Sequence, residues 1–85
     1  MTIQQNNQYQ FIQRLFIEKR KLMNLENDYM ITKEQLLEIQ LQDPVDISRV
    51  KFLQDRLKST RQSINKQRRF IHLFKLNNSN RFIRN

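Results

Sequence analysis

Apolar residues recur along the first half of the chain at alternating intervals of three and four positions. Between Tyr9 and Gln40 polar residues interrupt the repeat only at Glu18 and Thr32. Its apolar members are Phe11, Leu15, Leu22, Leu25, Tyr29, Leu36 and Ile39. Because this spacing puts the apolar side chains on one stripe of an α-helix, it predicts a long amphipathic helix over residues 9–41.

A second run repeats the pattern from Pro44 to Lys75, with polar interruptions at Thr60 and Gln67. Its apolar members are Val50, Leu53, Leu57, Ile64, Ile71 and Phe74. No stretch alternates convincingly in the way a strand requires. The second run therefore predicts another helix over residues 44–76, and the two runs together predict an all-α fold.

The only proline of the chain is expected to mark the start of the second helix. Asp43 has the side chain of an N-cap, and Pro44 suits the first helical position because it has no amide hydrogen to leave unpaired. Asp46 adds negative charge at the positive end of the helix. The residue before a proline avoids helical geometry, which confines the turn to residues 42–43. So short a turn predicts an antiparallel two-helix hairpin, long and coiled-coil-like.

Outside the hairpin, assigned to residues 9–76, polar and partly extended termini are expected: an N-terminal extension over 1–8 and a basic tail over 77–85. One alternative stays open inside the first helix. The segment "TKEQLL" begins at Thr32 like a fresh helix, with Gln35 at the capping-box position. A three-helix version would break the first helix between residues 27 and 32.

Length and composition favour a binding module or assembly component. A chain of 85 residues buries a limited core. It has no cysteine for a disulfide or thiolate metal site, no glycine for a phosphate-binding loop, and one histidine, His72, expected to be an ordinary helix residue. We therefore expect neither an enzyme nor a bound cofactor.

Targeting signals are also not apparent. No apolar run approaches the roughly 18 residues that span a bilayer, and the N-terminus lacks the charge and apolar core of a secretory signal. We expect no membrane insertion and no secretion by that route. The richness in Asn, Gln, Ile, Lys and Phe, with no Ala, is typical of an AT-rich genome such as that of an organelle. A protein working in an organelle without an Arg-rich leader would be made there or imported uncleaved.

Charge is distributed unevenly. The net charge is +8 and the isoelectric point is about 10.5. Residues 1–55 carry seven basic and eight acidic side chains, whereas residues 56–85 carry nine basic side chains and no acidic one. A face that only solvates a helix normally mixes both signs. The second helix and the tail are therefore predicted to bind a polyanion, with nucleic acid favoured over an anionic membrane surface or an acidic protein.

The basic residues of the second helix fall on two sides of its apolar stripe. One flank holds Lys51, Lys58, Arg61, Arg68, Arg69 and Lys75, and the other holds Arg49 and Arg56. Such a hairpin could sit in a groove with phosphates on both sides. The candidate nucleic-acid-binding residues are Lys33, Arg49, Lys51, Arg56, Lys58, Arg61, Lys66, Arg68, Arg69, Lys75 and Arg81.

Aromatic residues are interleaved with the basic ones. Phe52, Phe70, Phe74 and Phe82 could stack on unpaired bases or pack in the seam and against a partner. Phe70 and Phe82 are the better candidates for contacts outside the hairpin, because they lie off the stripe or past its end.

The segment "LQDPVDISRVKFLQDRLKS" resembles the central motif of the family of ribosomal protein twenty-nine of the large subunit. The matching positions are Leu41, Pro44, Ile47, Val50, Lys51, Arg56, Leu57 and Ser59, and upstream Lys33 falls on an arginine position and Gln35 on a glutamine. The resemblance covers roughly residues 22–66. Within it, "RVKFLQDRLKSTRQS" is also similar to a helix of small-subunit ribosomal protein fifteen, without the His-Asp-Ser element and glycine that should follow.

The first resemblance implies an antiparallel hairpin near the peptide exit tunnel of the large subunit. Its partners would be ribosomal RNA and neighbouring ribosomal proteins, with no small-molecule substrate. The ribosome expected is that of a mitochondrion or plastid, whose genome could encode the chain, in preference to that of a bacterial cytoplasm. The alternative is a helical-hairpin subunit or adaptor of a non-ribosomal assembly, for example a respiratory membrane complex. A small phage or plasmid DNA-binding regulator fits less well, because the chain lacks a glycine-containing helix-turn-helix.

Overall fold

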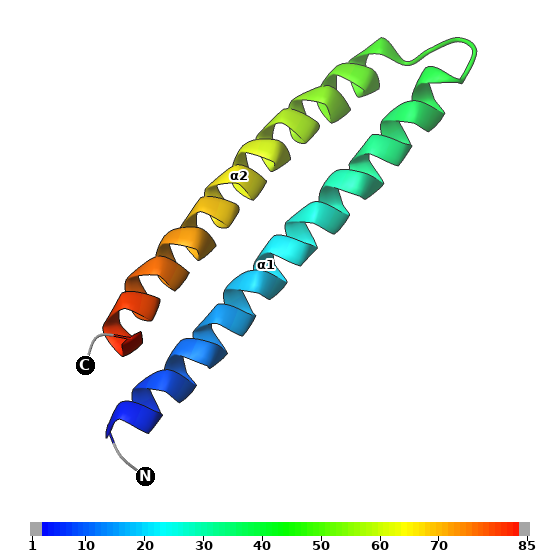
Figure 1. Ribbon diagram of the computed structural model, residues 1–85. Helices are drawn as coiled ribbons and strands as arrows, with labels where there is room; N and C mark the ends of the chain where they lie inside the picture. The colour runs from blue at the N-terminus through cyan, green and yellow to red at the C-terminus, as the bar shows by residue number, and fades with distance from the viewer. Residues whose placement is uncertain (1–2, 84–85) are drawn as a thin grey trace.

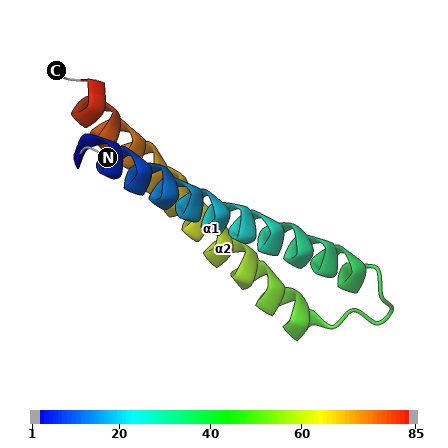
Figure 2. The same ribbon diagram turned by 90° about the horizontal axis from the view of Figure 1, so that it is seen from below.

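The computed structural model describes residues 3–83 and consists there of two α-helices joined by one loop. Helix α1 spans Ile3–Gln40 and helix α2 spans Ile47–Ile83. The helices lie side by side and antiparallel, with both chain ends at the end opposite the loop (Figures 1 and 2). The predicted all-α, antiparallel two-helix hairpin is confirmed, as a rod that measures 65 × 19 × 13 Å.

The predicted apolar stripes form the seam between the helices. Every apolar residue assigned to the two stripes is buried or half-buried. Near the loop, Leu36, Ile39 and Leu53 form a core cluster, against which Val50 and Leu57 pack. The seam continues away from the loop through Ile64 and Ile71, which are also buried.

Aromatic rings close the open end of the seam. The ring of Phe11 stacks on that of Phe74, with centroids 5.2 Å apart, and Phe70 stacks on Phe74 at 5.9 Å. Stacked rings contribute about 0.5–1.5 kcal/mol beyond the area they bury. These contacts hold the two helices together far from the loop.

The start of the second helix differs from the prediction. Helix α2 begins at Ile47 and not at Pro44, and the connection runs over residues 41–46 in place of residues 42–43. Asp46, and not Asp43, is the N-cap: its Oδ1 accepts a hydrogen bond from the Arg49 amide at 3.1 Å. Two aspartates stand three residues apart, so the local sequence offered two N-caps, and only the structure distinguishes them.

The first helix ends in a tightened turn. The Leu41 amide donates to the carbonyl oxygens of both Leu37 and Glu38 at 3.2 Å, and the Gln42 amide donates to that of Ile39 at the same distance. Such bonds occupy carbonyl groups that have no partner further along the helix. The helix therefore ends near Gln40, as its apolar stripe does.

Both helices extend past their predicted outer ends. The extension expected over residues 1–8 is helical from Ile3, and the tail expected over residues 77–85 is helical to Ile83. Adding a residue to an existing helix requires only its own ordering, whereas a new helix requires a costly nucleus. The Asn78 side chain also donates to the Phe74 carbonyl oxygen at 2.8 Å, which fits it into the last turns.

The three-helix alternative is excluded because α1 is continuous through residues 27–32. Thr32 does not cap a new helix. It is 1% exposed in the seam, and its hydroxyl donates to the Asp28 carbonyl oxygen at 2.8 Å. Inside a continuous helix, a threonine hydroxyl can thus donate a hydrogen bond to the carbonyl oxygen one turn earlier.

Candidate nucleic-acid interface

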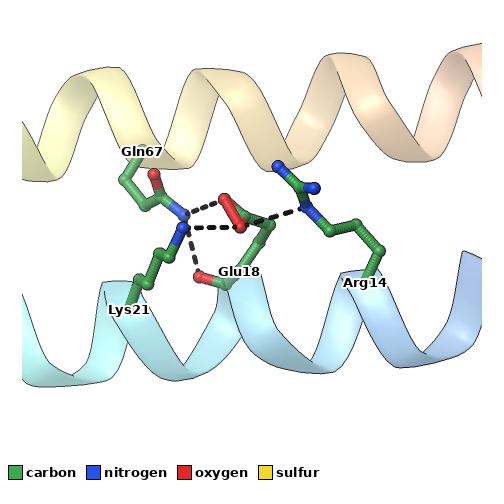
Figure 3. A network of polar contacts seen from close by, with 4 residues as sticks. All are labelled: Arg14, Glu18, Lys21 and Gln67. Atoms are coloured by element: carbon green, nitrogen blue, oxygen red, sulfur yellow. Dashed lines mark hydrogen bonds and ion pairs between the residues drawn. The ribbon is translucent and has the colours of Figure 1, made fainter.

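A polar network occupies the seam where Glu18 and Gln67 interrupt the two apolar stripes (Figure 3). The Gln67 amide donates to the Glu18 backbone carbonyl at 2.9 Å and to its carboxylate at 3.4 Å. The other carboxylate oxygen, Oε2, lies 3.4 Å from Arg14 Nε and 3.2 Å from Lys21 Nζ. This oxygen is buried and receives no well-aligned hydrogen bond, so the two cations balance its charge.

The pKa of Glu18 reflects opposing influences. Burial of the carboxyl group is the largest of them and favours the neutral form, but the polar contacts from Lys21 and Gln67 and the charges of Lys21 and Arg14 outweigh it. The pKa of Glu18 therefore lies below its ordinary value, and the carboxylate is charged at neutral pH. Glu18 and Gln67 belong to opposite helices and match only in one register.

Three of the arginines predicted to bind nucleic acid contact α1. Arg56 pairs with Asp28 at 3.0 Å and Arg68 pairs with Glu26 at 2.9 Å, in both cases between half-exposed side chains. Exposed pairs of this kind contribute about 0–1 kcal/mol each. The buried seam, more than these pairs, therefore sets how the basic helix is turned relative to α1.

Arg61 makes a contact of a different kind, with Tyr29. Its Nη2 donates to the tyrosine hydroxyl at 2.7 Å, and its guanidinium carbon lies 5.7 Å from the centre of the same ring. The hydrogen bond lowers the pKa of Tyr29 and raises the pKa of Arg61. Each group thus stabilises the charged form of the other.

The remaining candidate residues project into solvent. Among the candidate residues whose side chains are described, those with no ion pair or side-chain hydrogen bond to the rest of the chain are Lys33, Arg49, Lys51, Lys58, Lys66, Arg69 and Lys75, all exposed. The side chain of Arg81 lies outside the described residues. The site is therefore divided into arginines that contact α1 and cations that are available to a ligand.

The net positive charge of the two helices lies on α2. Helix α1 carries five basic and five acidic residues, whereas α2 carries ten basic residues and the single acidic residue Asp55. Lys51 and Lys58 are seven residues apart, which places them about 10.5 Å apart along the helix. With Lys66 and Arg69, which lie on the same side of α2, they form a row of four exposed cations, whereas Arg49 and Lys75 lie on other sides.

The aromatic candidates divide in the same way. Phe74 is half-buried in the seam, whereas Phe52 and Phe70 are 58% and 41% exposed. Phe70 still stacks on Phe74, so it is less available than its position off the stripe suggests. The side chain of Phe82 lies outside the described residues.

Sequence reasoning missed two features of this region. It treated Glu18 and Gln67 only as interruptions of the stripes. Because both lie on the seam side of their helices, they could have been matched as facing residues. It also assigned Arg56, Arg61 and Arg68 to a ligand without matching them to Asp28, Tyr29 and Glu26. An antiparallel alignment of the two heptad patterns would have placed opposite charges at facing positions.

Metal-binding and membrane-spanning features were also sought in the described part of the chain. There, no three side chains of His, Asp or Glu come together as metal ligands. Neither helix contains, within residues 3–83, an apolar stretch long enough to cross a membrane.

The fold and the charge define the class of this protein: an antiparallel helical hairpin with one neutral and one strongly basic helix. No protein-family model matches the chain, and searches of curated proteins and of solved structures give no match.

Proposed function

We propose that this protein is an RNA-binding structural subunit of a ribonucleoprotein, and specifically a constituent of the large ribosomal subunit near the peptide exit tunnel. The observation that carries the proposal is the basic helix α2, in which one acidic residue accompanies ten basic ones. The similarity of residues 22–66 to the family of ribosomal protein twenty-nine supports the ribosomal part. The protein has no catalytic role in this proposal.

Binding would depend on charge and shape. The seam holds the two helices together as a rod, so the exposed cations of α2 extend from a backbone that is already ordered when they meet phosphates. Base reading contributes little, because duplex RNA is recognised chiefly through its backbone and groove shape. Arg56, Arg61 and Arg68 add weak contacts with α1 to the packing of the seam.

Sedimentation tests this proposal directly. The tagged protein, expressed in its native source, should migrate with the large ribosomal subunit, in a mitochondrial or plastid fraction. Treatment with ribonuclease or removal of Mg²⁺ should release it. A position in the gradient that ribonuclease leaves unchanged would contradict the proposal.

A second candidate is a hairpin subunit or adaptor of a non-ribosomal protein assembly. The observation favouring it is that Arg56 and Arg68 already pair with carboxylates, and Arg61 with a tyrosine, across a protein contact. The same chemistry suits an acidic protein neighbour. A nuclease-resistant complex in the gradient would favour this candidate.

A further inference from the structure

Helix α1 carries a second row of apolar side chains that its partner helix does not cover. Tyr9, Phe16, Met23, Met30 and Leu37 follow one another every seven residues, and Ile12 lies beside them one turn from Tyr9 and Phe16. These six residues, the outer stripe, are 53–69% exposed although they are large and apolar. The seam of the hairpin uses none of them.

The spacing of the outer stripe indicates a helix as its occupant. A row that repeats every seven residues keeps a constant position relative to the first seam, which also repeats every seven residues. Shallow depressions accompany it, one lined by Ile12, Gln13, Phe16 and Ile17 and one lined by Phe16, Lys19, Arg20 and Met23. Depressions alternating with protruding side chains are the surface that knobs-into-holes packing requires.

The seven-residue repeat of the outer stripe is also symmetric about Met23 along the helix. Tyr9 and Leu37 are equally distant from Met23 along the helix, as are Phe16 and Met30. Two α1 helices packed antiparallel about Met23 would therefore place the five residues of the seven-residue repeat opposite one another, whereas Ile12, beside the repeat, would fall opposite Glu34 of the other copy. The same alignment brings Lys19 of one copy near Glu26 of the other, twice by symmetry, and Glu26 would then be shared with Arg68 of its own chain. A parallel pairing would oppose identical charges.

Net charge favours the same pairing. Helix α1 is neutral, with five basic and five acidic residues, so two copies can meet there without repulsion. The basic residues of α2 remain outside the contact. Two α2 helices packed together would instead bring twenty basic side chains into proximity.

The area is sufficient for a stable contact. Aromatic side chains bury about 150–250 Å² each and large aliphatic ones somewhat less, so six such side chains that are each more than half exposed present roughly 600 Å² per copy. A symmetrical pair would bury about twice that area, near the 1,200–2,000 Å² typical of specific interfaces. Apolar patches on monomers are seldom larger than about 300–600 Å².

We propose that the protein forms a symmetrical homodimer in which two α1 helices pack antiparallel through the outer stripe. The dimer is a four-helix assembly with a second apolar layer between the two neutral helices. Its self-association does not depend on the proposed function, because no RNA takes part in the contact.

The mass of the purified full-length protein tests the proposal. Sedimentation equilibrium should give twice the 10.6 kDa mass of the chain. Met23→Glu should give the mass of one chain with unchanged helical circular dichroism, because residue 23 is exposed in the hairpin. Phe52→Glu is the matched control, since Phe52 is 58% exposed and Met23 is 55% exposed, and it should remain dimeric. A monomeric wild type, or a Met23→Glu variant that stays dimeric, overturns the proposal.

Cysteine crosslinking tests the direction of the pairing, because the chain has no cysteine of its own. Met23→Cys should form a covalent dimer on mild oxidation, since the two positions meet at the symmetry axis. Leu37→Cys should not, because the two copies of residue 37 would be about 42 Å apart. Crosslinking of Leu37→Cys as efficient as that of Met23→Cys would indicate parallel helices and overturn the arrangement.

A charge exchange tests the identity of the partner. Lys19→Glu should raise the dimer dissociation constant about threefold to thirtyfold, since it removes two ion pairs. The double variant Lys19→Glu, Glu26→Lys should have a lower dimer dissociation constant than the Glu26→Lys variant. Glu26→Lys is the reference because it loses the same contact with Arg68. Wild-type protein that stays monomeric but binds anionic vesicles or an acidic helix from another protein would show that the outer stripe has a different occupant, and would overturn self-association.

Discussion

Glu18 is 3% exposed and charged, in a position where the repeat of the seam calls for an apolar side chain. A charge here is tolerated only because Arg14 and Lys21 flank it on its own helix and Gln67 reaches it from the other. Apolar side chains in this position could pack in several registers, whereas the Glu18–Gln67 contact forms in one. Buried polar pairs in coiled coils can specify register in this way, at the expense of stability.

The lowered pKa of Glu18 predicts acid sensitivity. The folded state holds the carboxylate below its ordinary pKa of 4.5, so the stability it contributes is present above that pH and is lost as the pH falls through the lowered value. Glu18→Gln should therefore be less stable than wild type at about pH 7, and the gap should narrow toward about pH 3. Urea unfolding at both pH values measures it.

Glu34→Gln is the control, because Glu34 is exposed and forms no ion pair within the described residues. Its stability should match that of the wild type at both pH values. A gap for Glu18→Gln that stays constant with pH would show that its effect arises from packing and not from the charge.

At the scale of the helices, the hairpin depends on how each helix begins and on what fills the seam. Helix α2 starts where Asp46 accepts the Arg49 amide, and its first buried residue, Leu53, lies less than two turns further on. The cap and the core cluster beside the loop therefore both stabilise the first two turns of α2. Leu53 is 1% exposed and contacts a cluster drawn from both helices.

The two aspartates of the loop should respond differently to replacement. Asp46→Ala should reduce the free energy of unfolding by about 0.5–2 kcal/mol, because it leaves the first amides of α2 without a side-chain acceptor. Asp43→Ala should change it by less than about 0.5 kcal/mol, as an exposed loop residue that does not cap the helix. Chemical denaturation of both variants measures the difference, and equal effects would contradict a cap at Asp46.

Truncation of Leu53 should be far more harmful than truncation of its neighbour. Leu53→Ala removes buried methyl groups and leaves a cavity, so it should reduce the free energy of unfolding by about 2–5 kcal/mol. Phe52→Ala removes a larger side chain that is mostly exposed, and should change it by about 0.5 kcal/mol or less. Thermal or urea unfolding compares them, and similar losses would place Phe52 in the core as well.

At the scale of the molecule, the hairpin separates two surfaces. Helix α2 presents cations to solvent along a rod 65 Å long, whereas α1 is neutral and presents the outer stripe. In the proposed dimer the neutral helices meet and the basic helices stay accessible. A dimer would therefore offer two basic rows to RNA, which increases the apparent affinity if both rows engage one molecule.

Charge reversal on α2 should weaken RNA binding more than the same change on α1. Lys58→Glu should reduce affinity for structured RNA and lower the slope of log affinity against log salt by about 1, as expected when a phosphate contact is lost. Arg20→Glu changes the net charge equally but lies on α1, and should have a smaller effect. Both changes are made in the Met23→Glu background, because Arg20 borders the outer stripe and could alter the dimer contact. Filter binding at several salt concentrations compares the two, and equal losses would indicate that net charge alone drives binding.

The sequence by itself determined the helices, their antiparallel pairing and the residues of the seam, because a repeat of three and four positions has only one apolar face to bury. It also determined that cations concentrate on α2. Tertiary structure decided the rest. It selected Asp46 over Asp43 as the cap, kept α1 continuous at Thr32, and paired Arg56, Arg61 and Arg68 with groups 28 to 42 residues away along the chain. Such partners depend on register and on the turn of one helix against the other, which local spacing does not contain.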